Sequence, residues 1–104
     1  MDDVCLYKVK YSKLFERDLV KSLDYIAEAH GVSAADNLRE KVELAVEKRS
    51  FNPASHRVYN SVKDPKQPYY TIKVGSYYVF YVVKGNTMII RRFIYAMRDL
   101  ESIV

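Results

Sequence analysis

The chain has 104 residues, enough for one hydrophobic core but not for two, so we expect a single domain over residues 1–104. Its 49% hydrophobic and 29% charged residues are typical of a globular protein and exclude an intrinsically disordered chain. The net charge of +4 is unevenly placed, because residues 1–52 carry nine Lys/Arg against ten Asp/Glu, whereas residues 53–104 carry eight against three. This asymmetry favours an acidic or polyanionic partner for the second half, the alternative being a merely solvated surface.

Cysteine content and hydropathy bear on location and cofactors. The one cysteine, Cys5, cannot form an intrachain disulfide, the first residues are acidic, and no long apolar run is present. These features predict a cytoplasmic protein with no membrane partner. One cysteine and two histidines far apart in sequence match no metal-ligand spacing, and glycine-rich phosphate loops are absent, so we expect neither a metal nor a cofactor.

The first third of the chain predicts a strand and a helix. From Leu6 to Tyr11, tyrosine and valine alternate with lysine, which is the period of a half-buried strand that joins a sheet. Ser12 can cap a helix from Lys13 to His30, which Gly31 ends. The apolar stripe of this helix consists of Phe15, Leu19, Leu23 and Ile26.

A second helix follows at once. It is predicted to begin at Ser33, with a hydroxyl three residues before the carboxylate of Asp36, and to end near Lys48 and Arg49. Its apolar stripe consists of Leu38, Val42, Ala45 and Val46. The short link makes the two helices an antiparallel hairpin whose joint apolar face can cover a sheet.

The segment from Tyr69 to Asp99 predicts the rest of that sheet, after a loop from Ser50 to Pro68 that holds all three prolines. Three runs rich in Tyr, Val, Ile and Phe are divided by Gly75-Ser76 and Gly85-Asn86, which are two-residue turns of tight hairpins. We therefore predict an α+β fold, in which the N-terminal strand and the helix hairpin pack on a twisted antiparallel sheet of about four strands.

Tight turns also fix which side chains share a face, because side chains alternate along a strand. The face covered by the helices is predicted to hold Tyr70, Ile72, Val74, Tyr77, Val79, Tyr81, Val83, Met88, Ile90 and Ile94. The opposite face is predicted to hold Thr71, Lys73, Tyr78, Phe80, Val82, Ile89, Arg91, Phe93 and Tyr95, which would make it cationic and aromatic.

Arg92 is an exception, because this register points it under the helices, where an arginine needs a carboxylate partner. Either Asp99 or an acidic residue of a helix supplies the partner, or a bulge turns Arg92 outward and the face assignment beyond Arg91 is wrong by one residue. A structural ion pair is the favoured interpretation.

The order of strand, helix hairpin, loop and meander resembles the RelE/ParE superfamily of type II toxin–antitoxin toxins. The most specific features are Tyr7, Val9, Tyr11 and Ser12 before the first helix, the SYYVFYVV strand, and the segment from Arg92 to Asp99. This last segment is similar to the family pattern Arg-Val-Leu-His-Gly-Arg-Arg-Asp. The resemblance covers nearly the whole chain.

The resemblance implies a toxin that a cognate antitoxin protein holds inactive. RelE-like members cleave ribosome-bound mRNA without a metal, and ParE-like members poison DNA gyrase; the shared fold does not decide between them. The first interpretation is inhibition of translation by mRNA cleavage, as an endoribonuclease. The alternatives are a non-enzymatic gyrase inhibitor, acting through the helix hairpin and the terminal segment, or a degenerate member that only binds its antitoxin.

RNA cleavage of this kind needs a base, cations around the phosphorane and an acid. The resemblance implies Lys73, Arg91 and Arg98 as phosphate cations and Tyr95 as a proton shuttle. Tyr78, Phe80 and Arg57 are the expected RNA-binding residues, with the aromatic rings stacking on bases. Thr71, Tyr78 and Tyr95 stand where RNA-cleaving members carry lysine, arginine and histidine. The alternative for the aromatic residues is an interface with the antitoxin.

Overall fold

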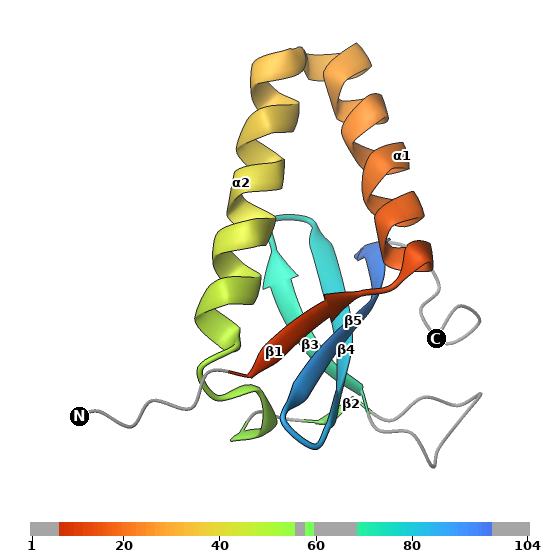
Figure 1. Ribbon diagram of the computed structural model, residues 1–104. Coiled ribbons are helices and arrows are strands. Elements are labelled where there is room, and N and C mark those ends of the chain that lie inside the picture. Colours follow the sequence, from red (N-terminus) through yellow and green to blue (C-terminus); the bar gives the residue numbers. More distant parts are fainter. Residues whose placement is uncertain (1–6, 56–57, 60–68, 97–104) are drawn as a thin grey trace.

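The computed structural model describes residues 7–55, 58–59 and 69–96. Two helices lie against one face of a twisted sheet, so the predicted α+β fold is confirmed (Figure 1). In chain order the elements are β1 (Lys8–Tyr11), α1 (Lys13–His30), α2 (Val32–Arg49), the 3₁₀ turn η1 (Pro53–Ser55), β2 (Val58–Tyr59), β3 (Tyr69–Val74), β4 (Tyr77–Lys84) and β5 (Thr87–Tyr95).

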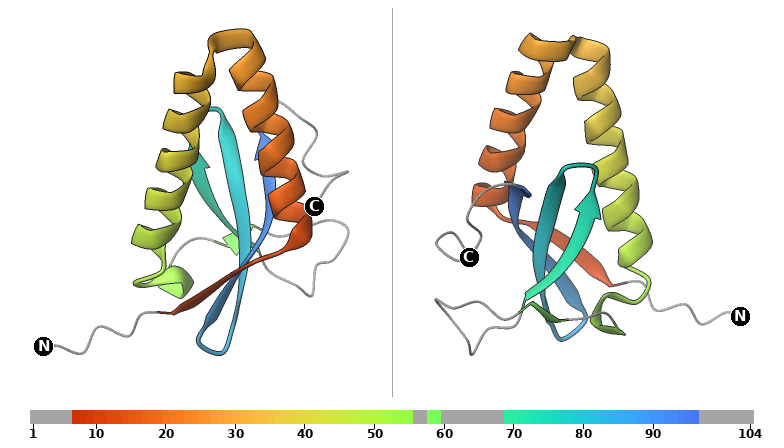
Figure 2. Two further views of the ribbon diagram at one scale, coloured as in Figure 1. Left: turned by 45° about the horizontal axis from the view of Figure 1, so that its top comes forward. Right: turned by 180° about the vertical axis from the view of Figure 1, so that it is seen from behind.

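The helix hairpin forms as its sequence predicts. Ser12 caps α1, because its Oγ accepts a hydrogen bond from the Phe15 N–H at 3.0 Å. Gly31 ends α1 with a φ of 97°, a backbone conformation that favours glycine, and it also precedes α2. The second helix therefore begins at Val32, one residue before the predicted start at Ser33. The predicted cap is wrong, because Ser33 lies inside the helix and no side chain caps its N-terminus. Figure 2 shows the two helices running in opposite directions on the same side of the sheet.

The strands of the sheet follow the order β1-β5-β4-β3-β2. Four of them have four to nine residues, and β2 adds two residues at one edge. The pairs β3–β4 and β4–β5 are antiparallel, as predicted, but β1 pairs with β5 in parallel. The sheet is therefore mixed. A parallel pairing needs a long connection between its two strands, and the segment between β1 and β5, which includes both helices, supplies one.

Both predicted hairpin turns are present, at Gly75-Ser76 and Gly85-Asn86. The glycines have φ values of 59° and 61°, while no non-glycine residue in the described part of the chain has a positive φ. A positive φ at the first turn residue alone is typical of a type II′ turn, whose twist matches that of the strands. The predicted pairs Tyr81–Ile90 and Val83–Met88 are confirmed.

Beyond that point the predicted faces of β5 are wrong. A bulge shifts the register between Phe80 and Tyr81, since Tyr81 pairs with Ile90 but Phe80 pairs with Arg92, leaving Arg91 without a partner. Phe93 therefore lies in the core under the helices, and Ile94 lies with Phe80 on the opposite face. Sequence alternation alone cannot reveal an inserted residue, and one insertion exchanges the faces of every residue after it.

The main core lies between the hairpin and the sheet, where α1 contributes Phe15 and α2 contributes Val42 and Val46. The strands contribute Ile72, Val74, Tyr77, Val79, Tyr81, Met88, Ile90 and Phe93. A second cluster on the opposite face contains Phe80 and Ile94, with Tyr69 and Tyr78 packed against them.

Tyr81 joins three elements through its hydroxyl. It donates to the Pro53 carbonyl at 2.7 Å and accepts from Arg49 Nη1 at 2.9 Å, and Arg49 also donates to the Thr71 carbonyl. The Tyr81 side chain is fully buried. Burial raises its pKa above the ordinary value, and the neighbouring Arg49 offsets part of this rise.

Replacing Tyr81 with phenylalanine is expected to lower the free energy of unfolding by about 1–3 kcal/mol at neutral pH, because the buried Pro53 carbonyl loses its donor. The wild-type protein should also lose stability above pH 10. In that range the unfolded chain releases the tyrosine proton while the native state, with its raised pKa, still holds it. Urea unfolding of both proteins from pH 7 to pH 11 measures both effects. An equal alkaline loss in Tyr81→Phe would contradict this origin.

Candidate functional site

The cationic and aromatic face predicted from the sequence is present only in part. Lys73 is exposed on β3, opposite the half-buried Tyr78 of β4, and Tyr78 lies opposite Ile94 of β5. Phe80, by contrast, is fully buried, and its ring makes edge contacts with Tyr69 and Tyr78 at 6.1 and 6.2 Å between centroids. Of the two predicted base-stacking residues, only Tyr78 presents part of its ring to solvent.

Tyr95 lies on the side of the sheet opposite to the predicted one, which corrects its assignment to the open face. It pairs with Tyr77 across β4 and β5, and the two rings meet at 5.5 Å. Tyr77 belongs to the core under the helices, so Tyr95 and Lys73 are on different faces. The bulge at Arg91 is the cause. The phenol of Tyr95 is therefore not positioned to exchange a proton with a phosphate held at Lys73.

Arg91 and Lys73 are also well separated. Lys73 is aligned with Ile94 across β4, and Arg91 lies three residues before Ile94 on a strand two places away. A spacing of about 4.8 Å between strands and a rise of about 3.3 Å per residue put their Cα atoms roughly 14 Å apart. Their side chains would have to extend fully toward each other to contact one phosphate. The remaining members of the predicted set, Arg57 and Arg98, lie outside the described residues.

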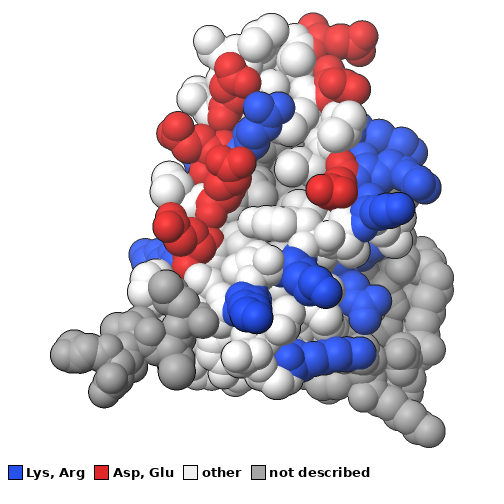
Figure 3. Space-filling model, viewed as in Figure 1, with Lys and Arg blue, Asp and Glu red and all other residues white. Residues whose placement is uncertain are grey.

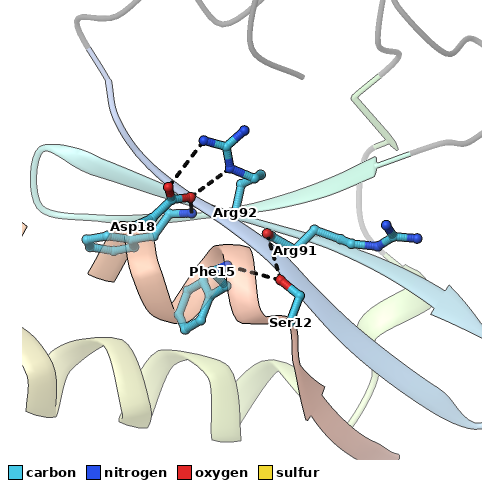
Figure 4. A network of polar contacts seen from close by, with 6 residues as sticks. Ser12, Phe15, Asp18, Arg91 and Arg92 are labelled. Carbon is cyan, nitrogen blue, oxygen red and sulfur yellow. Dashed lines mark hydrogen bonds and ion pairs between the residues drawn. The ribbon is translucent and has the colours of Figure 1, made fainter. Parts of the chain in front are cut away.

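Arg91 and Arg92 mark the place where β5 loses β1 as its neighbour and gains α1 (Figure 4). The Ser12 hydroxyl donates to the Arg91 carbonyl at 3.0 Å, and Asp18 accepts a hydrogen bond from the Phe93 N–H, also at 3.0 Å. The side chains of Ser12 and Asp18 thus hydrogen-bond to backbone groups of β5 beyond the point where β1 stops pairing with it. In Figure 4 the guanidinium of Arg91 points away from this network. Its Nε is buried and has no hydrogen-bond partner among the described residues.

The predicted ion pair of Arg92 is confirmed, with a helix carboxylate as the partner. Arg92 Nε and Nη2 donate to the two carboxylate oxygens of Asp18 at 2.7 and 3.2 Å. Both alternatives considered for Arg92 hold at once, since the bulge turns it away from the core and α1 reaches it at the sheet edge. Asp99, the other candidate partner, lies outside the described residues. Arg92 therefore stabilises the fold.

A cavity of about 690 Å³ opens on the helix side of the sheet, where α1 and α2 approach the β3–β4 turn. This cavity was not predicted from the sequence. Its apolar wall includes Tyr25, Ile26, Leu38, Tyr77 and Tyr95, and its rim carries Lys21 and His30. Tyr25 is 64% exposed although aromatic, and it lies outside the predicted apolar stripe of α1. An aromatic residue on the polar side of a helix was the available signal for this surface.

A smaller groove of about 370 Å³ runs between β1 and α2. It is lined by Val9, Tyr11, Leu44, Val46, Ser50 and the carboxylates of Glu40, Glu43 and Glu47. Figure 3 shows acidic side chains along α2 and basic side chains over the sheet and the lower part of α1. On the side of the molecule seen in Figure 3, acidic and basic side chains are therefore separated in space.

Two further findings concern the described residues only. No three side chains among them are grouped as a metal site would require. Neither helix is long and apolar enough to span a membrane.

Residues 9–100 match the family described as the ParE toxin of the parDE type II toxin–antitoxin system. The chain belongs to this family. No curated protein matches this ParE-family chain. Among solved structures, the chromosomal ParDE system from P. aeruginosa has a TM-score of 0.68 and 18% identity, over 86% of this chain and 96% of the other.

Two archaeal toxin–antitoxin structures are also similar to this ParE-family chain. The RelB–RelE complex from Methanococcus jannaschii has a TM-score of 0.50 and 26% identity, over 83% of this chain and 88% of the other. The RelE–RelB complex from Pyrococcus horikoshii OT3 has a TM-score of 0.54 and 21% identity, over 90% and 99%. The resemblance to the RelE/ParE superfamily is thereby confirmed.

Proposed function

We propose that this ParE-family toxin arrests growth by binding DNA gyrase rather than by cutting mRNA, and that a cognate antitoxin holds it inactive in the cytoplasm. The observation that supports the proposal is the separation of Lys73, Arg91 and Tyr95, the three predicted nuclease residues in the part of the chain that the structure describes. Lys73 and Tyr95 lie on opposite faces of the sheet. The strand spacings given above put the Cα atoms of Arg91 and Lys73 roughly 14 Å apart. Phosphodiester cleavage needs its base, acid and cations around one phosphate.

The match to the ParE profile supports the same choice, because ParE-like members of the superfamily are the gyrase poisons. The antitoxin partner is supported by the similar solved structures, which are a ParDE system and two RelB–RelE complexes. A toxin that acts by protein contact needs an exposed apolar and aromatic surface. The cavity around Tyr25 and Tyr95 supplies one, on the helix hairpin that the sequence analysis named for this mode.

Ribosome-dependent mRNA cleavage is the second candidate. It is favoured by the exposed Lys73 beside the half-buried ring of Tyr78. The two candidates differ in what fails first in the cell. A gyrase poison damages DNA while early translation continues, whereas an mRNA interferase stops protein synthesis promptly and leaves cleaved messages.

The test is to induce the chain alone and follow translation, mRNA integrity and DNA supercoiling together after growth stops. We expect continued early translation and DNA damage. Lys73→Ala should retain growth arrest, and Tyr25→Ala should weaken it at equal protein level, because Tyr25 is exposed at the cavity and contributes no core contact. Cleaved mRNA together with loss of toxicity in Lys73→Ala would overturn the proposal in favour of the second candidate. Absence of growth arrest would leave the antitoxin-binding role alone.

A further inference from the structure

Strand β1 ends the sheet, and within residues 7–55, 58–59 and 69–96 no strand pairs with its outer edge. The Lys8 N–H donates to the Asn86 carbonyl and the Ser12 N–H to the Ile90 carbonyl, each at 2.9 Å. In a parallel pair, alternate residues of a strand bond to the same neighbour. The backbone groups of Val9 and Tyr11 therefore point away from β5, toward the open edge.

The groove between β1 and α2 runs beside this edge. Val9 and Tyr11 line it from the strand, and Leu44 and Val46 line it from the helix. Leu44 is 57% exposed and Tyr11 is 45% exposed, which are large values for apolar and aromatic side chains. An unpaired strand edge beside an apolar wall is the surface to which an extended peptide adds as a further strand.

Charge restricts which peptide fits. Glu40, Glu43 and Glu47 recur along the exposed side of α2 and all line the groove. Burial raises the pKa of Tyr11, and the nearby charge of Glu43 raises it further, in keeping with the position of both residues in the groove. An acidic segment or a nucleic acid would face three like charges there. A second copy joined edge to edge by a two-fold axis would bring the two glutamate rows together at the joint.

The opposite side of the same edge adds a second restriction. Lys8 and Lys10 alternate with Val9 and Tyr11, so their side chains lie on the face of the sheet away from α2. A strand added beside β1 would have its own side chains alternate in the same way. Basic residues are favoured at the positions beside Glu40, Glu43 and Glu47, and neutral residues at the positions beside the two lysines.

We propose that the groove binds an extended peptide segment of a partner protein, with Lys or Arg at every second position, which adds a strand to β1. This site is separate from the cationic sheet face and from the cavity at Tyr25, and it does not depend on the proposed function. Backbone groups of Val9 and Tyr11 hold the segment, and the three glutamates select its charge and fix its register.

The test uses the full chain and a synthetic nine-residue peptide that alternates Lys and Thr, with a Glu-Thr peptide as its counterpart. We expect the Lys-Thr peptide to bind and to protect the amides of Val9 and Tyr11 from hydrogen exchange. Glu43→Gln/Glu47→Gln should weaken binding by at least about fivefold, since two charge contacts are lost. Glu16→Gln/Glu28→Gln makes the same charge change on α1, outside the groove, and should leave binding within about twofold.

Three results would overturn the proposal. The first is equal binding of the Glu-Thr peptide. The second is binding of the Lys-Thr peptide without protection of Val9 and Tyr11, which would place it elsewhere on the protein. The third is protection of these amides in the absence of peptide, if the protection increases with protein concentration and sedimentation shows a dimer. A second copy of the chain would then occupy the edge.

Discussion

Replacing Phe93 with alanine is expected to lower the free energy of unfolding by about 3–5 kcal/mol, the usual cost of removing a buried phenylalanine side chain. Phe93 is 3% exposed and contacts two other rings of the core. It stacks on Tyr77 at 4.6 Å between centroids and meets the edge of Phe15 at 6.0 Å. Thermal unfolding should show a fall of about 4–8 °C in the midpoint per kcal/mol.

The matched control is Tyr95→Ala, on the same strand and the same face but 44% exposed. Its cost should stay near 1 kcal/mol, because the ring makes few buried contacts beyond Tyr77. Together the two variants test the bulge. Without the shift at Phe80 and Tyr81, Phe93 would face away from the helices, so a loss below about 1 kcal/mol in Phe93→Ala would contradict the observed register.

The second large effect concerns Asp18, which holds α1 against the edge of β5. Asp18→Ala is expected to cost about 2–4 kcal/mol, because it removes the partner of the Arg92 guanidinium and leaves the Phe93 N–H without an acceptor. The cost falls somewhat below that of breaking a fully buried pair, since the side chains are 20% and 15% exposed. Chemical unfolding of the variant gives the value directly.

Asp24→Ala is the control, as an exposed aspartate on the same helix, and should change stability by at most about 0.5 kcal/mol. Asp18→Asn keeps an oxygen that can accept from the Phe93 N–H but removes the charge, so its cost should be intermediate. A double-mutant cycle with Arg92→Ala isolates the coupling between the two side chains. Equal stability of the Asp18→Ala and Asp24→Ala variants would show that the network contributes nothing.

Most of the fold was predictable because local signals agree with one another. Ser12 and Gly31 bound α1 as predicted, the apolar stripes of both helices face the sheet, and both glycine turns close the hairpins where expected. The parallel pairing of β1 with β5 was not predicted, since it depends on how two helices carry the chain across the sheet. Neither the sequence of β1 nor that of β5 specifies a direction by itself.

The candidate site was less predictable because it depends on one inserted residue. Alternation along β5 is correct up to Ile90, and Arg91 then exchanges the faces of Phe93, Ile94 and Tyr95. Nothing in the sequence of the two adjacent arginines indicates which of them has no paired residue on β4. Phe80 shows a second reason, since the face that α1 and α2 leave uncovered holds a cluster of its own, with Phe80 and Ile94 buried. The periodicity of one strand does not report what covers each face.

The pairing of β1 with β5 also determines when the protein can fold. Lys8 pairs with Thr87 and Tyr11 with Ile90, so β1 completes the sheet only with a strand that is 79 residues further along the chain. The helix hairpin and the β3–β4 pair rely on neighbouring residues and can form early, whereas closing this long separation is slow. During synthesis β1 therefore has no partner strand until translation has passed Ile90.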